Sequence, residues 1–134
     1  TAMFNTTNMV PGDTVSNCIE VDYTGSSFDL DPVTMYGSAT DNGLGDHLDV
    51  VISEGTGGGF GDCTGFSGST TFTGTVNGFA STHPAYGTGD AGYTPASGST
   101  ARVYKIDVTL GSDTPNTAQG ADAQASFTWE VRSA

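Results

Sequence analysis

Residues 14–23 read Thr-Val-Ser-Asn-Cys-Ile-Glu-Val-Asp-Tyr, and this stretch decides the fold class. Apolar side chains alternate along it with polar ones. One face carries Val15, Ile19, Val21 and Tyr23, and the other carries Thr14, Ser16, Cys18, Glu20 and Asp22. A period of two is typical of a β-strand that buries one face. The stretch therefore predicts a half-buried strand.

The same pattern recurs along the chain and is interrupted by clusters of turn-forming residues. We expect further strands at residues 28–36 (interrupted at Pro32), 48–52, 72–76, 102–110 and 123–131. Helix is expected only as short turns, at residues 44–48 and 76–81. Short strands separated by turns favour an all-β fold, an antiparallel jelly roll or β-sandwich with long Gly-rich loops.

Composition restricts the function classes. The chain has 134 residues, enough for one domain, with 3 Lys and Arg against 15 Asp and Glu and a net charge of −12. Nucleic-acid binding needs clustered cations, so we expect no nucleic-acid partner. The longest apolar runs are too short to span a bilayer, so no membrane insertion is expected.

Cys18 and Cys63 are the two cysteines of the chain. An even pair in a Gly-rich, Lys-poor chain predicts one disulfide in an exported protein, with free thiols as the alternative. Residue 1 is Thr and no signal peptide is visible. We therefore expect a secreted chain, extracellular or at the cell surface, whose signal peptide has been removed.

The chain carries few residues suited to catalysis, and we expect no enzyme. Its histidines, His47 and His83, lie in no HExxH motif, and no Gly-x-Ser-x-Gly elbow occurs. Asp41, Asp46 and Asp49 are weak candidates for Ca²⁺, with turn capping or solvation as the alternative. No other cofactor or metal is expected.

Two long stretches, residues 55–69 and 81–99, resist assignment to strands. Tyr86 and Tyr93 lie in the second stretch, among prolines and glycines. Aromatic side chains in such loops either contact sugars and partners or pin the loop to the sheet. A long loop in a compact domain is usually functional or locally tied down.

Residues 2–10 form an uncharged, strand-like segment before the Pro11–Gly12 turn. Such a segment can pair with the edge of its own sheet or with that of a neighbouring molecule. The sequence leaves both possibilities open.

Several motifs, taken in order, resemble those of the TasA/camelysin family, particularly its actinobacterial members. Residues 3–13 contain Phe followed by Met-Val-Pro-Gly-Asp, and lead into the Cys-Ile-Glu-Val strand at 18–21 and a Thr-Gly turn. The same resemblance extends to Glu-Gly-Thr-Gly-Gly at 54–58, Cys-Thr-Gly-Phe at 63–66, Gly-Tyr-Thr-Pro-Ala at 92–96 and Ala-Ser-Phe-Thr-Trp-Glu at 125–130.

The resemblance implies a secreted jelly-roll subunit, residues 13–134, of extracellular or biofilm-matrix filaments. Residues 1–12 would then supply a donor strand and hinge, and the donor strand would complete the sheet of the next copy in a head-to-tail homopolymer. Matrix polysaccharide is a further candidate partner. The implied donor residues are Ala2, Met3, Phe4, Thr6, Asn8, Met9 and Val10, with Pro11 and Gly12 as the hinge. Two alternatives remain: a glycan-binding adhesion module using Tyr86, Tyr93 and residues 55–69, and a camelysin-type metalloprotease using His47 or His83.

Overall fold

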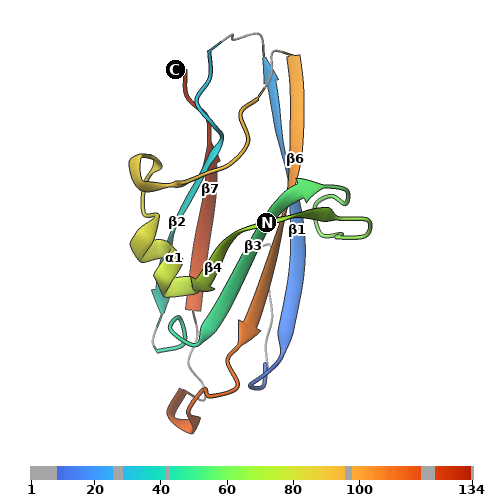
Figure 1. The fold of residues 1–134 in the computed structure, drawn as a ribbon. Coiled ribbons are helices and arrows are strands. Elements are labelled where there is room, and N and C mark those ends of the chain that lie inside the picture. The colour runs from blue at the N-terminus through green and yellow to red at the C-terminus, as the bar shows by residue number, and fades with distance from the viewer. Residues whose placement is uncertain (1–8, 26–28, 42, 96–97, 119–122, 134) are drawn as a thin grey trace.

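The computed structural model describes residues 9–25, 29–41, 43–95, 98–118 and 123–133. Most of them form strands (Figure 1), which confirms the prediction of an all-β chain with only short helical segments. The elements, in chain order, are β1 (Thr14–Gly25), β2 (Thr34–Asp41), β3 (Leu48–Thr56), β4 (Ser67–Thr75), α1 (Val76–Thr82), η1 (Tyr86–Thr88), β5 (Asp90–Ala91), β6 (Gly98–Leu110), η2 (Asn116–Ala118) and β7 (Ala123–Glu130).

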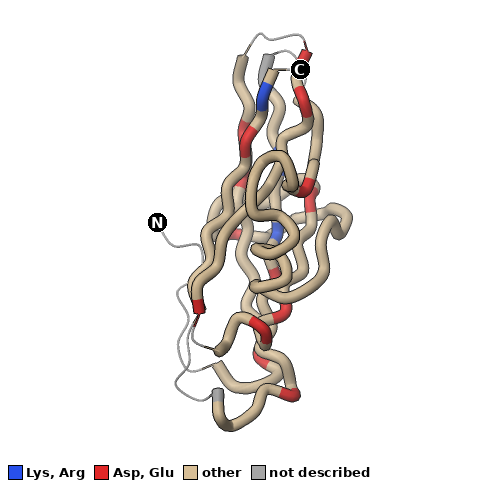
Figure 2. Tube along the Cα trace, turned by 90° about the vertical axis from the view of Figure 1, so that its left-hand side faces the viewer, with Lys and Arg blue, Asp and Glu red and all other residues tan. Residues whose placement is uncertain are grey.

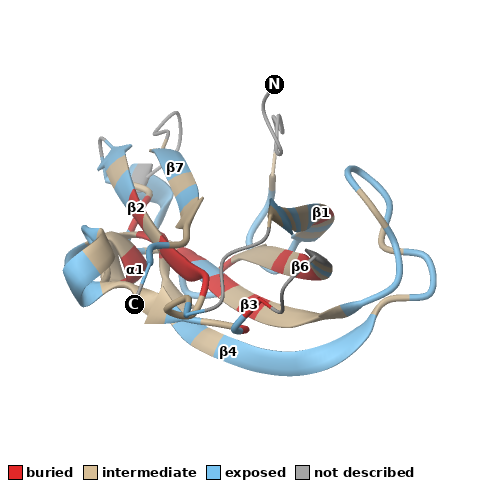
Figure 3. Cartoon of the chain, turned by 90° about the horizontal axis from the view of Figure 1, so that it is seen from above, coloured by how far each residue is buried: buried red, intermediate tan, exposed pale blue. Residues whose placement is uncertain are grey.

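The strands form two antiparallel sheets that face each other as a sandwich. One sheet has the order β1-β6-β3-β4 and the other the order β5-β2-β7. Helix α1 contacts β2 and β4, so it covers one side of the sandwich. Viewed from above, β1 and β7 are the outer strands on the side away from α1 (Figure 3).

The core fills the space between the inner faces of the two sheets. Period-two alternation places Ile19 and Val21 of β1 against this core, while Glu20 and Asp22 are exposed, as predicted. The fully buried side chains at its centre are those of Phe79, Met35, Ile52, Ile106 and Val50. Burial of such side chains is the main force that holds the sheets together.

The strand predicted at residues 28–36 begins later, at Thr34, and the predicted helical turn at 44–48 is not a helix. β2 runs from Thr34 to Asp41. The residues just before it do not extend the strand, because Pro32 lacks an N–H group and Val33 donates its N–H to Tyr93 O at 2.8 Å. Residues 45–47 form a turn in which His47 N–H donates to Leu44 O.

The two stretches without predicted strands contain regular structure at their ends. β3 continues to Thr56, β4 begins at Ser67, and η1, β5 and the start of β6 lie within residues 86–98. Most residues of β4 are exposed Ser, Thr or Gly, so the strand shows no hydrophobic alternation. The predicted helical turn at 76–81 is confirmed as α1, whose first residue follows Thr75; the Thr75 hydroxyl accepts a hydrogen bond from Gly78 N–H.

No helix in the described ranges has the length and apolar character that a bilayer crossing requires.

Candidate functional site

Strand β7 has one edge to which no described residue pairs. Its described pairing is with β2 alone. Phe127 lies opposite Gly37, whose N–H donates to His83 O at 2.9 Å, on the side of β2 away from β7. In an antiparallel ladder the backbone groups of such a pair both point outward. The N–H and C=O groups of Ala125, Phe127 and Trp129 therefore face away from β2; we call these three residues the open edge.

The inner face of β7 is only partly covered. Phe127 packs edge-to-face on Phe79 with 5.2 Å between ring centroids, and Trp129 lies 5.4 Å from the ring of Tyr104. Ala125 has the same strand parity as these two residues, yet it is exposed. The Trp129 Nε1 atom is buried and has no hydrogen-bond acceptor in the described part of the chain. An added strand would thus find both free backbone groups and uncovered side chains here.

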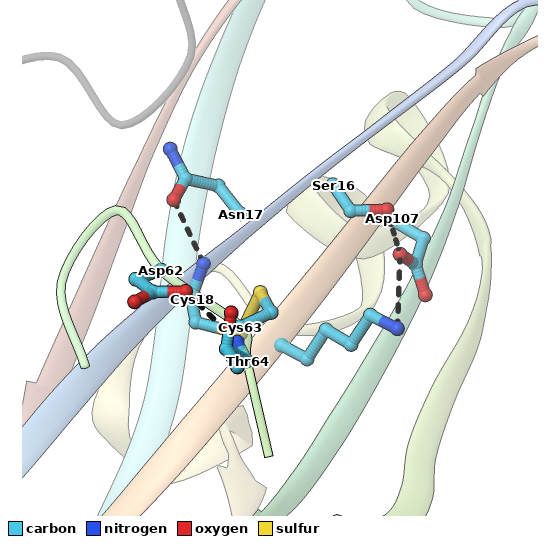
Figure 4. The surroundings of a disulfide bond; sticks show 8 residues. Ser16, Asn17, Cys18, Asp62, Cys63, Thr64 and Asp107 are labelled. Carbon is cyan, nitrogen blue, oxygen red and sulfur yellow. Dashed lines mark hydrogen bonds and ion pairs between the residues drawn. A yellow bond between two sulfur atoms is a disulfide. The ribbon is translucent and has the colours of Figure 1, made fainter. Parts of the chain in front are cut away.

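The outer edge of β1, by contrast, is closed in its middle. Cys18 N–H is bonded to Asn17 Oδ1 at 2.9 Å, and Cys18 O accepts a hydrogen bond from Gly61 N–H at 2.9 Å. A disulfide joins Cys18 to Cys63, with 5.3 Å between the Cα atoms (Figure 4). The predicted disulfide is confirmed. It fastens residues 57–66, which we call the arm, over this edge.

The arm is a tight, glycine-dependent hairpin. Gly59 and Asp62 exchange two backbone hydrogen bonds of 2.8 and 3.1 Å around Phe60, whose side chain is 55% exposed. Gly57, Gly58, Gly61 and Gly65 have φ of 90°, 85°, 77° and 80°. Other residues rarely adopt these angles, so the glycines make the arm's turns possible. Thr64, through its side chain and its N–H, bonds Asp62 and lowers the pKa of that carboxyl.

Most of the predicted donor segment lies outside the described residues, including Ala2, Met3, Phe4, Thr6 and Asn8. The structure does place its last two residues. Met9 is partly buried and packs against the core, whereas Val10 is 57% exposed.

The predicted hinge, Pro11 and Gly12, forms a closed turn at the start of β1. Asp13 N–H donates to Val10 O at 2.9 Å, Val10 N–H donates to Asp13 Oδ2 at 3.0 Å, and Gly12 N–H donates to Leu110 O at 2.7 Å. Gly12 has a φ of 96°, the value that the third position of such a Pro-Gly turn requires. The turn reverses the chain direction just before β1.

Of the weak Ca²⁺ candidates, Asp41 and Asp46 come together and Asp49 does not join them. Asn77 Nδ2 bridges Asp41 Oδ2 at 3.4 Å and Asp46 Oδ1 at 3.0 Å. Asp41 Oδ2 also accepts Gly45 N–H at 2.6 Å, and this backbone bond lowers the pKa of Asp41. Asp49 is exposed on β3. Among the described residues, no three His, Cys, Asp or Glu side chains gather in a metal-binding arrangement.

The two loop tyrosines differ in exposure. Tyr93 is buried at 7% exposure, and its hydroxyl donates to Val21 O at 2.9 Å, so it pins the loop to β1 instead of lying exposed. Tyr86 is half-buried, with the Arg132 guanidinium 4.0 Å from its ring centroid. Arg132 Nε bonds Glu130, which in turn accepts the Tyr36 hydroxyl. This chain of contacts ties the C-terminal residues to η1 and β2.

Within the described ranges, neither histidine groups with two further His, Cys, Asp or Glu side chains that could hold a metal ion. The ring of His83 packs 5.1 Å from that of Phe79, and its Nδ1 lies 2.8 Å from Thr88 O. His47 sits in the turn before β3, where its backbone bonds Leu44 and Gly111.

A half-buried group of titratable side chains lies where β3, β5 and β6 meet. The Tyr104 hydroxyl donates to Glu54 Oε2 at 2.7 Å, and burial raises the pKa of Tyr104 far above its usual value. Burial likewise raises the pKa of Asp90. Tyr104 is one of the most buried residues of the chain. These groups serve the packing of the core, because Tyr104 fills the space between the sheets.

Acidic residues are spread along the molecule, while the few basic ones lie apart (Figure 2). On the outer face of the larger sheet, Asp107 accepts a hydrogen bond from Ser16 and lies 3.9 Å from Lys105 Nζ.

Comparison with protein-family models, with curated proteins and with solved structures finds no match to this chain.

Sequence reasoning missed the open edge, because it depends on the order of strands within the sheets, which alternation along one strand does not specify. The attachment of the stretch at residues 55–69 to the strand that carries Cys18 follows from the predicted disulfide, and the structure confirms it. The one sequence feature that could have pointed to the open edge is Trp129, the single Trp of the chain, which lies in the last strand.

Proposed function

We propose that this chain is a secreted structural subunit that self-assembles into extracellular filaments. In this proposal, residues 1–10 of one copy add as a strand to the open edge of β7 in the next. The observation that carries the proposal is the contrast between two outer strands on the same side of the sandwich: the arm closes β1, and nothing described closes β7.

Strand number supports the same arrangement. The described elements comprise seven strands, four in one sheet and three in the other. A jelly roll has eight strands in two sheets. A strand added beside β7 would bring the smaller sheet to four, and would pair the N–H and C=O groups that now face outward.

Charge supports the choice of residues 1–10 as the added strand. The segment Thr-Ala-Met-Phe-Asn-Thr-Thr-Asn-Met-Val contains no charged side chain, although the whole chain carries −12. Its insertion would bring no additional repulsion to an acidic neighbour. A contact between two different surfaces of identical copies repeats without closing, and therefore yields an open filament.

Replacing Ala125 by Pro tests the open edge directly. We expect Ala125→Pro to abolish filaments while the sandwich remains folded, because proline removes an N–H group that faces away from β2 and blocks only the added strand. Negative-stain microscopy and sedimentation measure assembly, and near-ultraviolet circular dichroism checks the fold.

Ala125→Ser is the matched control, since it keeps the N–H group and should form filaments like the parent chain. Filaments of Ala125→Pro that equal the parent's in amount and width would contradict the assignment of β7 as the acceptor.

A further inference from the structure

Strand β4 lies at the opposite end of the larger sheet from β1. In the described part of the chain it pairs with β3 alone, so its outer edge is free. Residues 67–71 and Thr73 are exposed, so solvent reaches this edge. Seen from above, β4 borders the molecule on the side opposite β1 and β7 (Figure 3). The molecule therefore has a second free edge, on the side away from the open edge.

The register of the larger sheet shows which backbone groups of β4 face outward. In β6, Leu110 N–H donates to Asp13 O at 2.9 Å, so the backbone groups of Leu110 face β1 and not β3. Backbone groups alternate in direction along an antiparallel strand. When this alternation is followed through the pairs of β6 with β3 and of β3 with β4, the N–H and C=O groups that face away from β3 are those of Gly68, Thr70 and Thr73. We call these three residues the β4 edge.

The charge pattern sets β4 apart from every other described strand. Each of the other six contains at least one Asp or Glu, and β4 contains no charged residue. The neutral stretch extends beyond the strand, because residues 63–89, which include α1 and η1, contain no Asp, Glu, Lys or Arg. In a chain of net charge −12, a second copy meets the least repulsion at such a surface.

The β4 edge also lacks most of the features that keep strands apart. Natural sheets protect a free edge with charged side chains, proline or a bulge. β4 has neither charge nor proline, and it has one register shift, opposite Ile52 and Ser53. The shift divides the edge but leaves outward backbone groups on both sides of it, at Gly68 and Thr70 before it and at Thr73 after it. The edge is therefore open to pairing.

We infer that the β4 edge pairs with the β4 edge of a second copy, antiparallel and about a two-fold axis. Such a contact is self-complementary, because each copy offers the same N–H and C=O groups to the other. It also brings like side chains close together, which destabilises a strand with charges and does not destabilise a neutral one. Residues 1–10 suit this edge less, because their apolar side chains would meet exposed Ser, Thr and Gly instead of a core.

The consequence for assembly rests on the proposed function, whereas the contact itself does not. A head-to-tail filament carries one β4 edge per subunit, so two filaments that lie side by side can form the contact many times. One pair of short edges binds weakly, but repetition raises the overall affinity without any new contact. The β4 edges would then join filaments into bundles, while dilute single copies stay unpaired.

Charges placed on the β4 edge of the full-length chain test the contact. In Thr70→Glu combined with Thr73→Glu, we expect filaments to persist and the bundled fraction to fall at least about fivefold, because like charges then face each other across the two-fold axis. Low-speed sedimentation and electron microscopy measure bundling. The matched control, Asn116→Glu combined with Thr117→Glu, adds the same charge at exposed residues of η2 and should bundle within about twofold of the parent.

Hydrogen exchange gives a second readout that needs no filaments. In full-length Ala125→Pro, in which the open edge is blocked, the N–H groups of Gly68, Thr70 and Thr73 should exchange at least about threefold more slowly as the protein concentration is raised into the millimolar range. The N–H of Phe72, which faces β3, should not respond.

Two results would overturn the inference and leave the proposed function standing: glutamate variants that bundle as well as their control, or concentration-dependent protection that arises in other strands and not at the β4 edge. Loss of the filaments themselves in the glutamate variant would also overturn it, because β4 would then be the acceptor of residues 1–10. If the parent chain forms no filaments, the proposed function fails, and slowed exchange at the β4 edge would still support the contact.

Discussion

Deletion of residues 1–10 is expected to leave a folded monomer that forms no filaments at concentrations where the full chain polymerises. The truncated chain keeps both sheets and the disulfide. Among the described residues it loses Met9, which packs against the core, and Val10, whose two hydrogen bonds to Asp13 close the turn. What it lacks is the strand proposed to pair with the open edge of a neighbour. Light scattering and electron microscopy measure the outcome.

A full-length Thr6→Ser variant is the matched control, because it keeps the length, the polarity and the absence of charge. Its filaments should resemble the parent's. Two results would contradict the proposal. The truncated chain could polymerise normally, or the full chain could remain monomeric while truncation lowers its melting temperature, which would show that the segment pairs within its own molecule.

Loss of the disulfide is expected to produce the largest change in stability. The bond joins residues 45 apart in sequence, and the chain-entropy model gives about 4 kcal/mol of stabilisation for a loop of this length. The paired substitution Cys18→Ala and Cys63→Ala should lower the unfolding free energy by about that amount and the melting temperature by roughly ten degrees. Calorimetry and urea titration measure the two quantities.

Reductant provides the control for this prediction. The parent chain should melt lower when reduced, and the paired alanine variant should not respond. Release of the arm should also free the backbone C=O at position 18 from Gly61 N–H, so the variant's assemblies are expected to associate sideways through β1. Equal melting temperatures for the oxidised and reduced parent would refute the stabilising role of the bond.

Half-buried strands were the elements of the fold that could best be predicted from the sequence. β1 and the later half of β6 alternate cleanly, because one face of each packs on the core and the other meets solvent or the arm. The pairing of Cys18 with Cys63 was also predictable, since the chain has no other cysteine.

Elements fixed by distant contacts were not accessible in this way. β4 is an edge strand whose first five residues, 67–71, are exposed Ser, Gly and Thr, so no core imposes a pattern there; the part predicted from residue 72 onward contains Phe72, which packs on the core. The start of β2 is set by the bond between Val33 and Tyr93, sixty residues along the chain. Tyr93 itself looks like a surface side chain in a Gly/Pro-rich stretch, yet its ring belongs to the core and its hydroxyl donates to Val21 O.

Only part of the candidate site could be predicted from the sequence. The uncharged N-terminal segment and its Pro-Gly turn are visible in the sequence, and they suggest a strand that pairs with the edge of its own sheet or with that of a neighbouring molecule. Which edge receives it depends on strand order, on the arm over β1 and on the unpaired Trp129 donor. None of these follows from local periodicity.

In the proposed filament each subunit accepts a strand at β7 and donates residues 1–10, so its two ends differ and the filament is polar. The subunit at one end of the filament would expose the open edge of β7, and the subunit at the other end would carry residues 1–10 without a neighbouring β7 to pair with. A copy that lacks residues 1–10 could still accept the donor strand of the last subunit at its own β7, but it would have no donor strand to offer to a further copy. Small amounts of such clipped protein would therefore act as chain terminators, and proteolysis near the first residues would set polymer length.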